Sequence, residues 1–304
     1  MLGEIFYWIF NMSIAATICA IPVLLLRLFK KIPRRIFIWL WLVPFVRMCI
    51  PVGISSKYGI MALLSKFTTK TVTIVQIGDD SALTMMNHVM GANSYFPITY
   101  KVNLLENLFN IASVIWLIVA LAAILTLTII YFITLGEMKD AKKLKDNIYI
   151  SDKIKTPAVY GIIKPKIILP YDLHEGDIEV VLIHEKMHIR RMDNLFRIIA
   201  LFILTLHWFN PVCWLFLKLF LNDIELACDE CVLLKLGEER KKEYALSLLK
   251  NGEKKTVFAS AFGGAKMRTR IENILSFKRL TAVSAIAFTA LIFSIFYLTL
   301  TNAV

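Results

Sequence analysis

The sequence is poor in charge, which argues against an ordinary soluble fold. Of its 304 residues only 19% are charged, whereas 58% are hydrophobic. Soluble domains carry about 25% charged and about 45–50% apolar residues, so we expect parts of this chain to lie in lipid. Five cysteines in this length exclude a disulfide scaffold, and the composition excludes a disordered or collagen-like protein.

Long apolar runs predict four membrane spans. The runs are Ile5–Leu26, Ile36–Ile54, Leu108–Leu135 and Thr281–Leu300. The second is the weakest, because Pro44, Arg47 and Pro51 interrupt it. The first lacks a basic n-region and an A-x-A-like cleavage site, so we expect an uncleaved span rather than a signal peptide.

The distribution of positive charge predicts the orientation. The loop Arg27–Arg35 carries five positive and no negative charges, so it is expected in the cytoplasm, with both termini outside. Alternation then places Ser55–Asn107 outside and residues 136–279 inside, where 25 Lys and Arg outnumber 19 Asp and Glu. We interpret the formal net charge of +12 as contact with an anionic cytoplasmic leaflet. Direct binding to nucleic acid is not expected, because no basic stripe is interleaved with aromatic residues.

The outer segment contains one pattern. Thr68–Ile77 alternates enough to predict a strand, and Gly78–Ser81 predicts a turn after it. We expect a connector here rather than a sensor.

A metal-binding pattern lies in the predicted cytoplasmic part. His184-Glu-Lys-Met-His188 is an H-E-x-x-H motif, and apolar residues recur around it at helical spacing, with Asp177 as the expected N-cap. His184 and His188 therefore fall one turn apart on one helical face. Two imidazoles placed in this way can bind one Zn²⁺, and Glu185 beside the metal can take a proton from water. The alternative is two surface histidines on an ordinary helix.

A catalytic zinc needs a third protein ligand and an open fourth position. Glu225-Leu-Ala-Cys-Asp229 presents two carboxylates on one helical face. We predict Glu225 as the third ligand and Asp229 as the hydrogen-bond partner that fixes the tautomer of a ligand histidine. The E-x-x-x-D pattern is common by itself, and only its pairing with H-E-x-x-H gives it weight.

This ligand set excludes a membrane span at Phe196–Leu221, because such a span would separate Glu225 from the two histidines. The stretch is broken at Asn210-Pro211, where a helix must end. We predict a helical hairpin that lies in the domain core or dips into the cytoplasmic leaflet. Its two helices are Asn194–Phe209 and Val212–Lys235. We expect His207 and Asn210 to supply polar partners at the break, with a structural role for His207 rather than metal ligation.

Several neighbouring residues are not expected to take part in the chemistry. Arg190, Arg191 and Asp193 are expected to form an electrostatic helix end. Cys228-x-x-Cys231 lies in a predicted reducing compartment, which disfavours a disulfide, and a metal role for the pair is also disfavoured.

Short β-rich runs precede the metal-binding helix. Ala158–Ile163 and Lys166–Leu169 are punctuated by prolines, which indicates an edge strand because proline cannot donate to a central ladder. A peptide substrate can add to such an edge as a further strand. A purely structural hairpin is an equally good interpretation.

These motifs resemble the BlaR/MecR-type antirepressor membrane metallopeptidases over about residues 1–300. The matching segments are His184–His188, Glu225–Asp229, His207–Pro211 and Pro157–Pro170. The resemblance implies a gluzincin-like zinc domain on the cytoplasmic side. It also implies zinc binding by His184, His188 and Glu225, with Glu185 as general base and Asp229 supporting a ligand.

The chain departs from the best-known members of that family at its end. They carry an extracellular penicillin-binding sensor with an S-x-x-K nucleophile after the fourth span, whereas this sequence stops at Val304. Its S-x-x-K, Ser247–Lys250, lies on a predicted cytoplasmic helix with no K-T-G after it. We expect one of three cases: the sensor is absent, another protein supplies it, or it lies outside this sequence.

The fold predicted is a mostly α membrane protein. Four transmembrane helices carry a cytoplasmic gluzincin-like α+β zinc protease domain between the third and the fourth. Residues 1–135 form the three-span region with the outer loop, 136–279 the protease domain with the hairpin at about 194–235, and 280–304 the last span with a short outer tail.

The predicted function is hydrolysis of peptide bonds at the cytoplasmic face by a zinc endopeptidase that inactivates a transcriptional repressor. The other expected partners are the lipid bilayer, the chain itself through self-cleavage, and a second copy in a homodimer. Two alternatives stay open: a housekeeping protease for misfolded membrane proteins, and a non-catalytic membrane receptor or scaffold.

Overall fold

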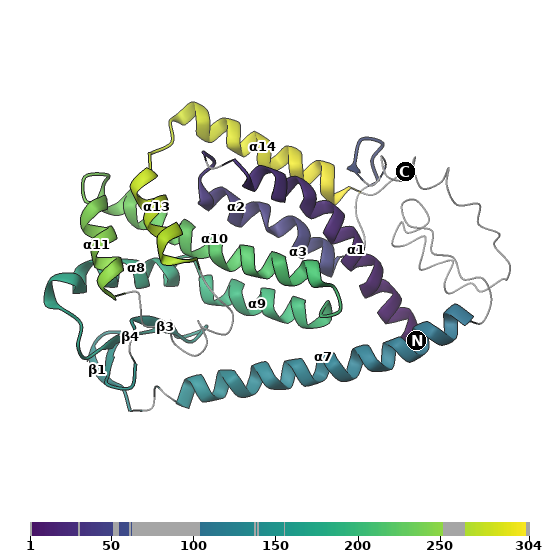
Figure 1. The fold of residues 1–304 in the computed structure, drawn as a ribbon, viewed down its shortest axis with the longest axis horizontal. Coiled ribbons are helices and arrows are strands. Elements are labelled where there is room, and N and C mark those ends of the chain that lie inside the picture. Colours follow the sequence, from purple (N-terminus) through teal and green to yellow (C-terminus); the bar gives the residue numbers. More distant parts are fainter. Residues whose placement is uncertain are drawn as a thin grey trace.

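The part of the chain that the structure describes is mostly helical, with a small sheet at one end (Figure 1). The computed structural model describes residues 2–29, 31–50, 55–60, 62, 104–136, 138, 140–154, 156–251 and 265–301. The predicted strand Thr68–Ile77 and most of the predicted outer segment Ser55–Asn107 lie outside these residues.

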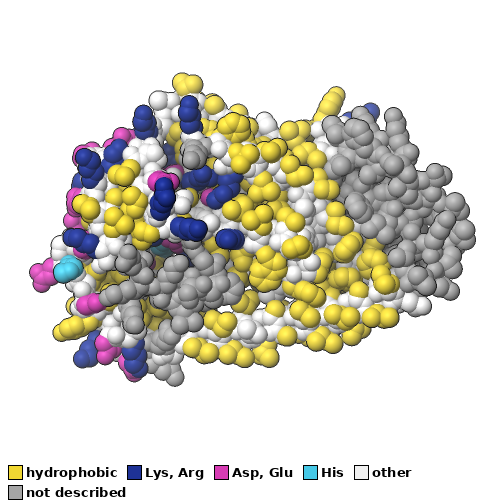
Figure 2. All heavy atoms as spheres, in the orientation of Figure 1, with side chains coloured by type: hydrophobic (Ala, Val, Ile, Leu, Met, Phe, Trp, Pro, Cys, Tyr) yellow, Lys and Arg dark blue, Asp and Glu magenta, His cyan; other side chains and the backbone are white. Residues whose placement is uncertain are grey.

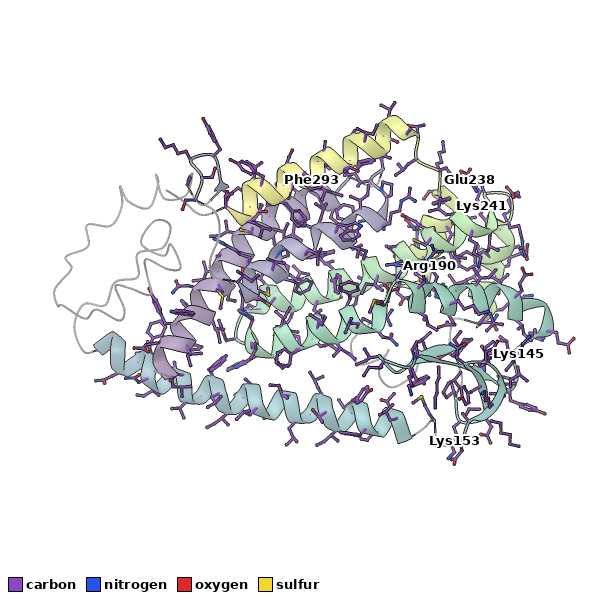
Figure 3. All side chains as sticks on the ribbon, turned by 180° about the vertical axis from the view of Figure 1, so that it is seen from behind. Lys145, Lys153, Arg190, Glu238, Lys241 and Phe293 are labelled. Atoms are coloured by element: carbon purple, nitrogen blue, oxygen red, sulfur yellow. The ribbon has the colours of Figure 1, made fainter. Side chains whose placement is uncertain are left out.

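Three of the described helices are long and apolar enough to cross a membrane: α1 (Leu2–Arg27), α7 (Leu104–Gly136) and α14 (Ala282–Leu300). Hydrophobic side chains cover this middle part of the molecule, whereas charged side chains gather over the end that holds the sheet (Figure 2). Phe293 on α14, labelled in Figure 3, is 71% exposed. Apolar exposure along whole helices is unfavourable in water, so these surfaces indicate contact with lipid.

The second predicted span, Ile36–Ile54, is not one continuous helix in the structure. α2 (Arg34–Leu40) and α3 (Leu42–Cys49) meet at Trp41, and both contribute to the largest apolar core. Pro44 explains the break, because it lacks an N–H and its ring crowds the carbonyl four residues earlier. Neither short helix has the length of a span.

The apolar stretch before the E-x-x-x-D motif folds back on itself. α9 (Asp193–Leu206) and α10 (Pro211–Leu236) lie side by side and are joined by a short turn (Figure 1). The side chain of Asn210 accepts a hydrogen bond from the Val212 N–H at 3.0 Å. Pro211 takes the first position of α10, where its missing N–H costs nothing. The turn therefore forms at the predicted break.

The closed end of this hairpin is held inside the helical bundle. Asn210 Nδ2 donates to Ser13 Oγ at 2.8 Å, in the middle of α1. His207 Nε2 donates to the carbonyl of Met48 at 3.2 Å, which confirms a structural hydrogen bond for this histidine. Trp116 of α7 donates to the last carbonyl of α9 at 2.8 Å. The turn thus lies at the depth of the middle of two candidate spans.

The sheet has the order β1-β2-β4-β3, with β2 and β4 parallel and the other pairs antiparallel. Its strands are β1 (Lys142–Lys145), β2 (Ile148–Ser151), β3 (Ala158–Tyr160) and β4 (Lys166–Pro170). The predicted edge strand is correct for β3 only, because β4 is paired on both sides. Pro170 is the last residue of β4, so its missing N–H affects the ladder only at the end of the strand.

Three further helices gather with the sheet at the charged end of the molecule (Figure 1). They are α8 (Glu175–Arg190), α11 (Lys241–Asn251) and α13 (Met267–Ser276). Together with the second half of α10 they enclose a small apolar core that includes Val180, Cys228, Val232, Tyr244 and Ile274. This packing brings α8, α10, α11 and α13 to one place, where the predicted metal ligands lie.

Candidate metal centre

The predicted metal-binding helix forms, but it starts earlier than expected. α8 begins at Glu175, so Asp177 lies inside the first turn and is not the N-cap. Its carboxylate still stabilises the helix there, because a negative charge is attracted to the positive N-terminal end of the helix dipole. His184, Glu185 and His188 are all buried.

The two histidines of α8 direct the same nitrogen toward one point. Their Nε2 atoms lie 3.2 Å apart, and the two rings are nearly perpendicular, at 85°. Zinc binds imidazole nitrogen at about 2.0–2.1 Å in tetrahedral geometry, which places two such ligands roughly 3.4 Å from each other. The pair therefore fits two ligands of one metal ion.

The pKa values of the two histidines move in opposite directions. Burial and the charges of His188 and Arg270 lower the pKa of His184 well below its usual value. Burial would also lower the pKa of His188, but its hydrogen bond to the Asp193 carboxylate and the negative charge of Glu225 raise it above that value. Two basic nitrogens in contact need one proton between them. A metal ion bound to both Nε2 atoms would displace this proton.

Glu225 reaches the same point from α10. Its Oε2 lies 4.0 Å from His188 Nε2, and its carboxylate pairs with Arg197 of α9 and with Arg270 Nη1 at 3.4 Å. Burial would raise the pKa of Glu225, but the charges of His188, Arg197 and Arg270 lower it below the usual range. The carboxylate therefore stays ionised, as a metal ligand must be.

Tyr244 of α11 occupies the free nitrogen of His184. Its hydroxyl lies 2.9 Å from His184 Nδ1 and donates to Asp229 Oδ1 at 2.5 Å. Asp229 itself is 3.7 Å from that nitrogen, so the direct hydrogen bond predicted for it is replaced by a relay through the tyrosine. A hydroxyl that donates to a carboxylate accepts from Nδ1–H, which leaves the Nε2 lone pair for a metal.

Asp193 plays the corresponding part for His188. Its Oδ2 accepts from His188 Nδ1 at 2.7 Å. The predicted helix end is therefore only part of the role of this residue: Asp193 lies in the first turn of α9, and it also accepts a hydrogen bond from His188. Met192, with a left-handed φ of 56°, makes the sharp turn that returns Asp193 to α8. No glycine or asparagine marked this turn in the sequence.

Cys228 offers a competing third ligand. His184, His188 and Cys228 form a group whose ligand atoms lie within 4.8 Å of one another. The thiol, however, contacts His184 at Nδ1, 3.7 Å away, on the edge that Tyr244 also occupies. Burial raises the pKa of Cys228 to about 11, so this thiol would have to lose its proton to bind a metal. Glu225, ionised and on the Nε2 side, is the better third donor.

Glu185 lies between the two histidines in sequence and is buried with them. Burial raises the pKa of its carboxyl group. A carboxylate with a raised pKa is suited to accept a proton from water and to pass it on.

The sequence did not single out Tyr244, Arg197 and Arg270. They come from α11, α9 and α13, and none of these three segments contains a recognisable motif around the residue. Only the packing of these helices against α8 and α10 brings their side chains to the site.

Comparison with known proteins agrees with this geometry. The family model described as BlaR1 peptidase M56 matches residues 7–281. Regulatory protein BlaR1 of Bacillus licheniformis is 30% identical over 153 residues, which is 46% of this chain and 26% of that protein. The methicillin resistance mecR1 protein of Staphylococcus aureus strain Mu50 is 31% identical over 104 residues, 33% of this chain and 18% of that protein. The chain thus spans about a quarter or less of the length of these relatives.

Proposed function

The chain belongs to the BlaR1 peptidase M56 family, and from that premise we propose that it is an integral membrane zinc endopeptidase acting at the cytoplasmic face. The observation that carries the proposal is the convergence of three ligand atoms. The Nε2 atoms of His184 and His188 lie 3.2 Å apart, and an ionised Glu225 oxygen lies 4.0 Å from the latter.

In this proposal His184, His188 and Glu225 hold the metal. Zinc bound there would polarise the scissile carbonyl and lower the pKa of a water molecule. Glu185 would accept a proton from the attacking water and pass it to the leaving amine.

Two further contacts orient the ligands. Tyr244, itself bonded to Asp229, holds the Nδ1 atom of His184, and Asp193 holds the Nδ1 atom of His188. Partners of this kind fix the tautomer and the ring orientation of metal-bound histidines.

The cytoplasmic location is supported by contacts of the positively charged loop Arg27–Arg35. Arg27 makes two hydrogen bonds to Asp223 of α10, at 3.0 and 3.1 Å, and the Arg34 N–H donates to Glu230 at 2.8 Å. These carboxylates flank Glu225 along the same helix. These contacts support a proposal in which the loop and this end of α10 lie on the same side of the membrane, and the positive-inside rule favours the cytoplasmic side.

We propose an architecture that counts residues 34–50 as a span interrupted at Trp41, which gives four spans. The protease domain, residues 136–279, then lies between the third and the fourth span, and residues 280–304 form the last span and a short outer tail.

The substrate is proposed to be a cytoplasmic transcriptional repressor, by analogy with relatives named for regulation and methicillin resistance. A peptide could add to the edge strand β3, which lies against α8. Asn194 fixes this strand by donating to the carbonyl of Val159 at 2.9 Å, one residue after Asp193. Self-cleavage and homodimer formation are further proposals from the same analogy.

The test compares purified full-length protein in lipid nanodiscs with two variants, His184→Ala and Glu185→Gln, for zinc content and cleavage. We expect the wild type to retain zinc and to cleave itself or an added cytoplasmic protein. Glu185→Gln should retain zinc and lose at least about a hundredfold in rate, because only the proton acceptor is removed. His184→Ala should lose the zinc as well.

Glu175→Gln is the matched control, because this glutamate lies on the exposed first turn of the same helix and its loss should leave both readouts unchanged. Zinc binding with cleavage that is equal in wild type and Glu185→Gln would overturn the proposed mechanism and favour a non-catalytic receptor.

A further inference from the structure

α10 carries two sets of carboxylates on different faces. Glu225 and Asp229 face the candidate metal centre. Asp223 and Glu230 are seven residues apart, so they lie two turns apart on another face, about a third of a turn away. This second face packs against α2, which begins at the end of the loop Arg27–Arg35 (Figure 1).

Glu230 supplies the cap that α2 lacks. The residue before this helix is Pro33, whose side chain cannot accept a hydrogen bond, and the first N–H groups of a helix have no partner within it. The two carboxylate oxygens of Glu230 accept from the Arg34 N–H at 2.8 Å and from the Arg35 N–H at 3.2 Å. Glu230 is only 4% exposed. Because a buried carboxylate needs such donors, this contact ties α10 to the start of α2.

Asp223 makes a second attachment on the same face. It is completely buried and accepts from Arg27 at 3.0 and 3.1 Å and from Trp41 Nε1 at 2.9 Å. The two attachments lie about 10 Å apart along α10. Together they fix the rotation of this helix about its axis as well as its position along the axis.

The position of Glu225 depends on that rotation. At about 6 Å from a helix axis, a rotation of about 10° moves a carboxylate by roughly 1 Å. A functional site needs its groups held within about 0.5 Å. Glu225 Oε2 lies 4.0 Å from His188 Nε2, and Glu225 stands between Asp223 and Glu230 in the chain. The attachments of α10 to the membrane helices therefore determine where the third ligand stands.

We propose that Glu230 is a positioning residue: by holding the start of α2, it fixes the rotation of α10 that turns Glu225 toward His184 and His188. Its partners in α2 are backbone N–H groups, so this attachment depends on the start of the helix and not on a particular side chain. This inference rests on the proposed metal centre. It makes the join between the first two membrane segments part of the support of that centre.

The first experiment measures zinc affinity by chelator competition for the full-length protein in nanodiscs. We expect Glu230→Gln to bind zinc about tenfold more weakly, because the amide accepts only through its oxygen and its NH₂ group opposes the second N–H. Glu238→Gln is the matched control, since Glu238 accepts from the Arg279 N–H at 2.9 Å in an exposed contact just beyond α10. This control should keep the wild-type affinity. A Glu230→Gln protein that melts at a lower temperature but keeps the wild-type zinc affinity would overturn the proposal, because a purely structural role gives that result.

A double-mutant cycle tests whether Glu230 acts through Glu225. In a Glu225→Ala background, Glu230→Gln should change the zinc affinity by less than about twofold, because the carboxylate that Glu230 positions is gone. An equal loss of affinity in both backgrounds would contradict the positioning role.

A second variant removes the donor instead of the acceptor and leaves α10 intact. Arg34→Pro lacks the N–H that Glu230 accepts, and proline is well tolerated at the first position of a helix. Arg34→Ala is its control, because it loses the same side chain but keeps the N–H. Arg34→Pro should bind zinc several-fold more weakly than Arg34→Ala, and equal affinities would contradict the proposal even if Glu230→Gln does not fold. Failure of the wild type to bind zinc would overturn the proposed metal centre itself, so the two failures are distinguishable.

Discussion

The hairpin of α9 and α10 buries polar side chains at both ends, but with different chemistry. At the closed end, Asn210 and His207 bond hydroxyl groups and a backbone carbonyl of neighbouring helices. At the open end, Asp223, Glu225 and Asp229 are carboxylates, and each contacts at least one arginine.

This difference follows from where each end lies. The closed end is level with the middle of α1 and α7, where lipid offers no hydrogen bonds and a charge would be very unfavourable. The open end lies in the charged part of the molecule, beside the loop Arg27–Arg35. One apolar hairpin can therefore hold the charged residues of the candidate metal centre, provided that the charges stay at one end and are paired.

The largest effect is expected from breaking the ion pair between the open end and the first membrane helix. Asp223 is completely buried and accepts from Arg27 and from Trp41 Nε1. Asp223→Asn should lower the free energy of unfolding by about 3 kcal/mol or more, because it leaves a partly buried guanidinium without its counter-charge. Chemical unfolding in detergent micelles measures this loss of free energy. Adding Arg27→Gln should recover part of the loss, and strictly additive effects would show that the pair is not coupled.

The next effect concerns the metal rather than the fold. Asp193→Asn should weaken zinc binding by about 10- to 100-fold, because His188 loses its charged hydrogen-bond partner. Chelator competition measures this change. Asp140→Asn, at an exposed pair with Lys153, should not alter the affinity. Unchanged zinc binding in Asp193→Asn would mean that this carboxylate serves only the start of α9.

The smallest effect is expected at the closed end. Asn210→Ala removes the cap of α10 and should lower the free energy of unfolding by about 1 kcal/mol, with no change in zinc affinity. Thermal unfolding together with zinc titration tests both parts. A loss of zinc affinity in Asn210→Ala would show that the closed end and the open end of the hairpin are coupled, and would contradict their separate roles.

Much of the hairpin, and the position of His184 and His188 on one helical face, could be predicted, because their signals are local. Pro211 ends one helix and starts the next wherever it stands, and His184 and His188 share a face in any helix. The second span was less predictable, because Pro44 allows either an interrupted span or two short helices. The cap at Asp177 was misplaced by three residues, because an acidic side chain is favourable both at the N-cap and within the first turn of a helix.

The sequence by itself determined the apolar lengths, the turn at Asn210 and the spacing of the two histidines. The tertiary structure alone decided which side chains occupy the remaining nitrogens of those histidines and which cation accompanies the carboxylates. Tyr244 stands 60 residues from His184 and Arg270 stands 86 residues from it. The physical reason is distance: periodicity and propensity act over a few residues, whereas a hydrogen bond needs two atoms within about 3 Å, and only packing brings such segments together.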